Sequence, residues 1–157
     1  MENLKVNRKQ KEIDIVVQNR GLSNLVNCRI VLTVVTNELK TTFKSAKLFK
    51  AEADLSGSKL NYNDPATTMS IKSTVSKYPE SISKRKSIFY RGVRTTKMVI
   101  KDYNKLERRK HYTFQLMIGE GEAPMHMQYT LEVFAGKKGV NDDEENLVNK
   151  LSWKGDI

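Results

Sequence analysis

Two stretches of the chain, Tyr112-Thr-Phe-Gln-Leu-Met-Ile118 and Met127-Gln-Tyr-Thr-Leu-Glu-Val-Phe134, alternate between apolar and polar residues. Successive side chains of a β-strand point to opposite faces of the sheet, so this alternation predicts two half-buried strands. The segment between them, Gly119-Glu-Gly-Glu-Ala-Pro124, is rich in turn-forming residues. We therefore expect the two strands to form an antiparallel hairpin with a rather long loop.

Weaker versions of the same pattern recur along the chain. The further expected strands are residues 12–17, 28–36, 43–49, 69–75, 87–91 and 95–100. Residues 28–36 are almost continuously apolar and β-branched, which is typical of a central strand. The strands at 87–91 and 95–100 are expected to pair across Arg91-Gly-Val-Arg94. Eight short strands with little helix predict an all-β, antiparallel β-sandwich, of which the jelly roll is one form.

The sandwich is expected to be one domain spanning residues 1–157. Strand alternation predicts a shared core made of Ile30, Leu32, Val34, Phe114, Leu116, Leu131 and Val133. Residues 1–11 are short and moderately basic, and we expect a flexible arm there. Residues 141–157 form an acidic tail with one short helix, Asp143–Leu151, capped by Asn141 or Asp142. Residues 101–111 are compatible with one or two further helical turns.

Cys28 is the only cysteine, so no intramolecular disulfide can form, which favours a reducing intracellular compartment. Its apolar surroundings in the sequence predict a buried, unreactive thiol. No apolar stretch reaches the ~18 residues that a membrane-spanning helix needs. The first residues also lack the apolar segment of a secretory signal.

The sequence offers little to support catalysis. His111 and His126 are the only histidines, and together with one cysteine they have no zinc-binding spacing. There is no phosphate-binding glycine loop and no Gly-x-Ser-x-Gly motif. The carboxylates of Glu120 and Glu122 fall in the predicted turn, where solvation explains them. We therefore expect a protein that is not an enzyme and that uses no metal and no cofactor.

Positive charge is concentrated between residues 84 and 110. This segment has eleven Lys or Arg and two acids, a net charge of +9 against +10 for the whole chain. If residues 95–100 form a strand, Thr95, Lys97 and Val99 share one face, and Thr96, Met98 and Ile100 the other. The candidate nucleic-acid contacts are Lys84, Arg85, Lys86, Phe89, Tyr90, Arg91, Arg94, Lys97, Lys101, Arg108, Arg109 and Lys110.

Such a cluster needs a polyanion, and nucleic acid is the commonest one. The aromatic rings of Phe89 and Tyr90 favour a single strand, on whose bases they can stack. An acidic protein, an anionic membrane surface and a simply solvated face are the less favoured alternatives.

The acidic run Asp142, Asp143, Glu144 and Glu145 is interpreted as a contact to the basic cluster of a second copy. Such head-to-tail contacts predict homo-oligomers larger than a dimer. The alternative interpretation of the acidic run is that its four acids form the N-terminus of a helix, where the helix dipole favours negative charge.

The segment YTFQLMIGEGEAPMHMQYTLEVFAG, residues 112–136, is similar in pattern to the last two strands of small viral jelly-roll coat proteins of plant single-stranded DNA viruses. The preceding basic block, SKRKSIFYRGVRTTKMVIKDYN, also resembles the Lys/Arg-rich region of those coats. The resemblance implies a coat-type protein that binds nucleic acid and self-associates, located in the virion. It departs from the family in lacking a long Arg-rich N-terminal arm. A matrix- or movement-type protein between nucleoprotein and membrane, and a cellular single-strand-binding regulator, are the alternatives.

Overall fold

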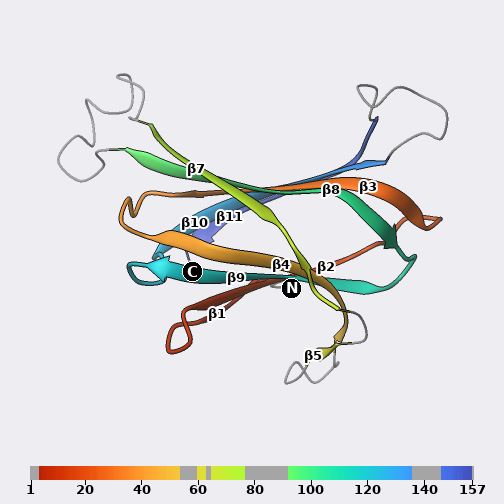
Figure 1. Ribbon diagram of the computed structural model, residues 1–157, viewed down its shortest axis with the longest axis horizontal. Helices are drawn as coiled ribbons and strands as arrows, with labels where there is room; N and C mark the ends of the chain where they lie inside the picture. Colours follow the sequence, from red (N-terminus) through yellow and green to blue (C-terminus); the bar gives the residue numbers. More distant parts are fainter. Residues whose placement is uncertain (1–3, 54–59, 63–64, 77–91, 136–145, 157) are drawn as a thin grey trace.

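The computed structural model describes residues 4–53, 60–62, 65–76, 92–135 and 146–156. Over these residues the chain forms strands joined by turns and loops, with no helix. The strands build two antiparallel sheets, which lie face to face as the lower and upper layers of Figure 1. The predicted all-β sandwich is confirmed.

The two sheets draw their strands from all parts of the chain. Sheet A contains, in spatial order, β1 (Leu4–Asn7), β2 (Glu12–Gln18), β9 (His111–Glu120), β4 (Thr42–Ala53) and β5 (Leu60–Tyr62), with β6 (Thr67–Thr68) also paired to β4. Sheet B contains β11 (Asn146–Asp156), β10 (His126–Ala135), β3 (Leu25–Thr36), β8 (Val93–Leu106) and β7 (Ser70–Ser76). The predicted strands at 12–17, 28–36, 43–49, 69–75 and 95–100 correspond to β2, β3, β4, β7 and β8.

The core lies between the sheets and is built by alternation. All seven predicted core residues, from Ile30 to Val133, are buried in one cluster with the inward side chains of β2, β4 and β8. In sheet B, Leu131 stands opposite Leu32, and in sheet A Phe114 stands opposite Ile15. Since a one-residue slip would turn each strand's apolar set outward, this core also fixes the strand register.

Cys28 is fully buried in the same cluster. Burial raises the pKa of its thiol to about 11, because the charged thiolate is disfavoured away from water. The predicted burial of this side chain is confirmed.

The predicted hairpin is wrong. β9 belongs to sheet A, between β2 and β4, whereas β10 belongs to sheet B, between β3 and β11. The chain between them, residues 121–125, therefore crosses from one layer to the other. Both strands present large apolar side chains to one face, and these pack across the sandwich. Strand alternation alone does not distinguish the two arrangements.

The predicted C-terminal helix is also wrong over its described part. Residues 146–156 form β11, which pairs with β10 from Ala135↔Asn146 to His126↔Asp156. The hydrogen-bonded ladder outweighs the local preference for a helix, which is a weak determinant. Residues 143–145 of that helix lie outside the described residues. The helical alternative for 101–111 fails too, since β8 continues as a strand to Leu106.

Two other expectations at the edges need revision. The expected flexible arm contains β1, which pairs with β2 and turns back through residues 8–11. β8 pairs with β3 and β7, and the strand expected at 87–91 lies outside the described residues.

The strand pairs β3·β10, β4·β9 and β7·β8 are nested in sequence: each pair lies between the two members of the pair before it, as in a long antiparallel hairpin that has been rolled up. The jelly roll shares this nesting, but here β11 extends sheet B beside β10. No helix among the described residues is long and apolar enough to span a membrane.

Candidate functional site

The structure places the predicted nucleic-acid contacts in three groups. Six of them, Lys84, Arg85, Lys86, Phe89, Tyr90 and Arg91, lie outside the described residues, as do the acids at 142–145. Arg94, Lys97 and Lys101 lie on β8, and residues 108–110 form the turn between β8 and β9. From Lys97 to the end of β8 at Leu106 the strand extends about 30 Å. Lys97 and the turn therefore belong to separate surfaces, and Lys101 lies between them, about 16 Å from Leu106.

The faces of β8 are those predicted from alternation. Thr96, Met98 and Ile100 are buried in the sandwich, while Lys97 and Lys101 are exposed on its outer surface. The strand thus presents cations to solvent on one face and supplies the core with the other.

A further lysine joins this surface from β7. Lys72 is the register partner of Lys97, so the two exposed lysines stand directly opposite each other on the outer face of sheet B. β7 and β8 lie side by side in the upper layer of Figure 1. Sequence reasoning missed Lys72, because the loose alternation of residues 69–75 indicates a strand but not its partner.

Among the residues that the structure describes, no acid adjoins this lysine pair on the outer face. Its same-face neighbours, two residues along each strand and across on β3, are uncharged: Ser70, Thr74, Thr95, Val99 and Thr33. Like charges directly opposite on adjacent strands are destabilising. An anion bound between the two ammonium groups would remove that repulsion, and the threonine hydroxyls could donate further hydrogen bonds to it. We call Lys72, Lys97 and Lys101 the basic face of sheet B.

Arg94, at the start of β8, joins neighbouring segments of the chain by hydrogen bonds. Its Nε and Nη2 donate to the carbonyl oxygen of Leu39 at 2.9 and 2.7 Å, and its Nη1 donates to Ser73 Oγ at 2.8 Å. The guanidinium therefore ties the β3–β4 loop to β7. These bonds use most of its donors, so Arg94 contributes less to anion binding than the basic face does.

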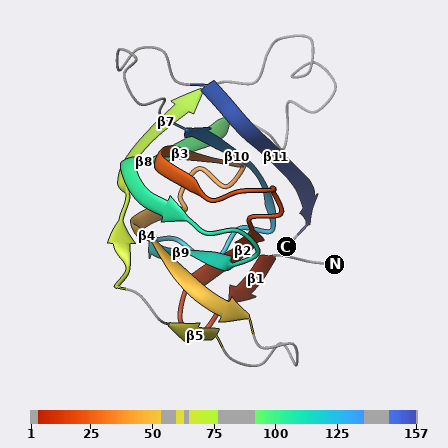
Figure 2. The same ribbon diagram turned by 90° about the vertical axis from the view of Figure 1, so that its right-hand side faces the viewer.

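The second surface lies at the far end of β8, where the β2–β3 loop meets the β8–β9 turn. Figure 2 looks at this end of the molecule. Asn19 joins the two segments: its carbonyl accepts from Arg109 N at 2.7 Å, and its Nδ2 donates to Leu106 O at 2.9 Å. Arg108 N also donates to Asn24 Oδ1 at 2.7 Å. The exposed cations here are Arg20, Lys105, Arg108, Arg109 and Lys110.

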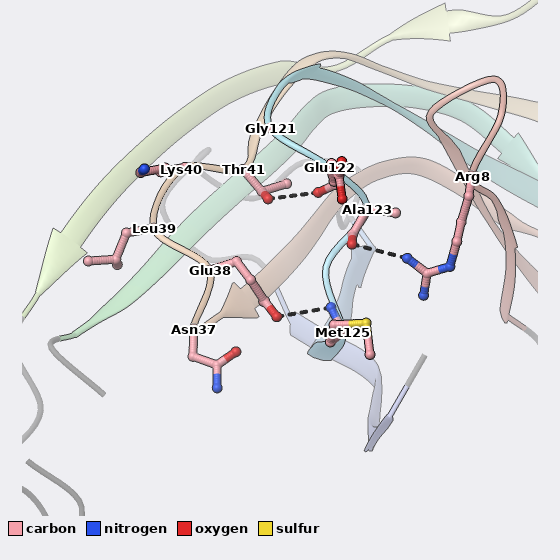
Figure 3. A pocket seen from close by; sticks show the side chains of 10 residues that line it. All are labelled: Arg8, Asn37, Glu38, Leu39, Lys40, Thr41, Gly121, Glu122, Ala123 and Met125. Atoms are coloured by element: carbon pink, nitrogen blue, oxygen red, sulfur yellow. Dashed lines mark hydrogen bonds between the residues drawn. The ribbon is translucent and has the colours of Figure 1, made fainter. Parts of the chain in front are cut away.

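The opposite end of the sandwich has an open hollow of about 600 Å³. Figure 3 shows its lining, which comes from the β1–β2 turn, the β3–β4 loop and the β9–β10 loop. Arg8 Nη1 donates to Ala123 O at 3.2 Å, Thr41 Oγ1 to Glu122 O at 2.8 Å, and Met125 N to Glu38 Oε1 at 3.0 Å. These bonds hold the three loops together and give the side chains of Arg8, Thr41 and Glu38 a structural role.

Two acids share the outer face of sheet A. Glu12 and Asp14 are two residues apart on β2, and Lys5 of β1 stands opposite Asp14. Burial raises the pKa of Asp14 to about 7, helped by the negative charge of Glu12 and a hydrogen bond with it, while Lys5 opposes the shift. Glu12 in turn accepts a hydrogen bond from Gln115. Neither acid lines the hollow, and the described residues contain no group of three His, Cys, Asp or Glu that could hold a metal ion.

Comparison with known proteins adds little. No family model and no curated protein sequence matches this chain. Among solved structures it is similar to AvmM, described as catalysing macrocyclization in alchivemycin A biosynthesis. The match has 11% sequence identity and a TM-score of 0.43, and covers 98% of this chain and 89% of that one. A likeness this distant carries no argument about function.

Proposed function

We propose that this protein is a non-enzymatic, self-associating structural protein that binds single-stranded nucleic acid through the basic face of sheet B. One observation carries the proposal: Lys72 and Lys97 stand opposite each other, exposed and without an acid among their described same-face neighbours. A phosphate backbone supplies the negative charge that this pair lacks.

The position of Lys72 and Lys97 in sheet B supports a role for them beyond blocking unwanted strand pairing at a sheet edge. Lysines on edge strands block unwanted strand pairing, and β7 is an edge strand of sheet B. That role accounts for Lys72 but not for Lys97, because β8 lies inside the sheet between β7 and β3. Lys101 continues the charge along β8, so a strand of nucleic acid following β8 would meet two lysines in succession.

A coat-type protein of a virus, located in the virion or inside the cell, is the most concrete form of this proposal. Self-association beyond a dimer would join the basic residues of one copy to the acids at 142–145 of the next. Among the described strands, β1, β5, β7 and β11 stand at the edges of the sheets, and an edge is where a further strand can add. A matrix-type or movement-type protein, or a cellular single-strand-binding regulator, would use the same basic face.

The test compares two double variants with equal charge change. Lys72→Glu/Lys97→Glu reverses the pair, and Lys44→Glu/Lys47→Glu reverses two exposed lysines on sheet A. Fluorescence anisotropy with a labelled single-stranded oligonucleotide, at one low salt concentration, measures both. We expect the first variant to lose roughly tenfold or more in affinity and the second to lose far less. Equal losses would show that net charge alone governs binding and would overturn the proposed site.

A further inference from the structure

Exposed cations and exposed apolar side chains occur together where the β2–β3 loop meets the β8–β9 turn, at the end of the molecule that faces the viewer in Figure 2. Leu22, in the β2–β3 loop, is 90% exposed, and Val26, at the start of β3, is 46% exposed. They are two of the four large apolar side chains that the described part of the chain leaves exposed. Val26 is the register partner of Lys105, so apolar and cationic side chains lie next to each other here.

The net charge at this end is positive. The β2–β3 loop, residues 19–24, and the turn at residues 107–110 contain four cations and one acid, Glu107. Lys50 pairs with Glu107, and the hydrogen bond from Lys50 lowers the pKa of that carboxyl. Lys50 therefore offsets most of the negative charge of Glu107, with smaller contributions from Lys105 and Lys110, and Arg20, Arg108 and Arg109 remain for an external partner.

The two segments hold each other in a defined shape. Besides the bonds of Asn19 and Asn24, Gln18 Nε2 donates to Arg109 O at 3.1 Å, and Gly21 N donates to Asn19 Oδ1 at 2.9 Å. Arg109 itself has a φ of 63°, a left-handed conformation that places the turn against the β2–β3 loop. Leu22 is thus presented on a braced loop, and little ordering entropy is lost when it binds.

We propose that this end docks on an anionic lipid surface, with Leu22 entering the boundary between headgroups and acyl chains. The surrounding Arg and Lys side chains contact the lipid phosphates, as cationic residues next to an apolar anchor do. A single exposed leucine needs no explanation by itself. Its place on a braced loop among cations favours a membrane, because the boundary between headgroups and acyl chains buries the leucine while the lipid phosphates contact the cations.

About 30 Å of β8 separates Lys97 from the end of the strand at Leu106, and about 16 Å separates Lys101 from it. Nucleic acid at the Lys72–Lys97 pair and a membrane at the Leu22 end can therefore be bound at the same time, and the protein would bridge the two. This inference does not depend on nucleic-acid binding, because it rests on different residues.

Vesicle co-sedimentation with the whole protein tests it. The probes are phosphatidylcholine vesicles with and without phosphatidylserine, an anionic lipid of the cytoplasmic leaflet. We expect binding only to the anionic vesicles. Leu22→Ser should lower the partition coefficient about tenfold, whereas Val75→Ser, a control at an exposed apolar residue on β7, should leave it unchanged.

A charge series separates lipid from nucleic acid. Arg20→Gln/Arg108→Gln/Lys110→Gln should lower vesicle binding on the order of 100-fold, at about fivefold per cation. Lys40→Gln/Lys44→Gln/Lys47→Gln removes the same charge elsewhere and should have a much smaller effect. Circular dichroism confirms folding of each variant. Equal vesicle binding by Leu22→Ser and wild type would overturn the proposal. So would a charge variant that loses oligonucleotide affinity while keeping its vesicle affinity.

Discussion

Leu116→Ala tests the core that the two sheets share. Leu116 is fully buried at the centre of sheet A, opposite Ile13 on β2 and Ala46 on β4. Truncation removes the transfer free energy of the lost methyl and methylene groups and leaves a cavity. Strands on both sides hold the backbone in place, so the cavity cannot collapse easily. We expect the free energy of unfolding to fall by ~2–5 kcal/mol.

Urea denaturation followed by circular dichroism measures this change. The denaturant slope m should stay constant, so that a shift in midpoint reports stability alone. Leu22→Ala, at a side chain that is 90% exposed, serves as the control and should change stability by less than about 0.5 kcal/mol. A loss below about 1 kcal/mol for Leu116→Ala would refute the assignment of this face to the core.

Three further predictions concern the thiol, one carboxyl and the assembly. A thiol reagent should label Cys28 only after denaturation, and rapid labelling of the native protein would contradict its burial. The folded-state pKa of Asp14 is raised from 3.8 to about 7, so the folded state binds this proton more tightly than the unfolded state does. Stability should therefore decrease as the pH rises from about 4 to about 7, and Asp14→Asn should flatten this part of the profile; an unchanged profile would assign the dependence to other groups. Neutralising the four acids at 142–145 should reduce oligomer size in light scattering without unfolding the protein, and a wild-type protein that stays monomeric at high concentration with nucleic acid present would contradict self-association.

Much of the strand pattern was predictable because local alternation encodes it. The alternation around Lys97 and Met98 predicted which side chains of β8 are exposed and which are buried. The alternation around Leu116 predicted the burial of that side chain. Strand partners were not predictable in the same way. β9 and β10 have the pattern of a hairpin, yet they lie in different sheets, because pairing depends on residues far apart in the chain. The helix expected at 143–151 failed over its described part for the same reason: β10 offers residues 146–156 a ladder that local propensity ignores.

The candidate surfaces show the same limit. A count of charge between residues 84 and 110 indicated a polyanion partner but suggested one continuous patch. The length of β8 separates Lys97 from Arg108, and the register brings Lys72 to Lys97 from another part of the chain. Leu22 gave no signal in the sequence, because only the structure shows that a leucine in a polar loop stays exposed.

The central claim is that Lys72 and Lys97 contact phosphates. The most direct measurement is the dependence of single-strand affinity on salt for wild type, Lys72→Gln/Lys97→Gln and the control Lys44→Gln/Lys47→Gln. Each lost phosphate contact lowers the slope of log K against log salt by about 0.7. The account predicts a slope smaller by about 1.4 for the first variant and an unchanged slope for the control. An unchanged slope for Lys72→Gln/Lys97→Gln, or the same decrease in both variants, would contradict it.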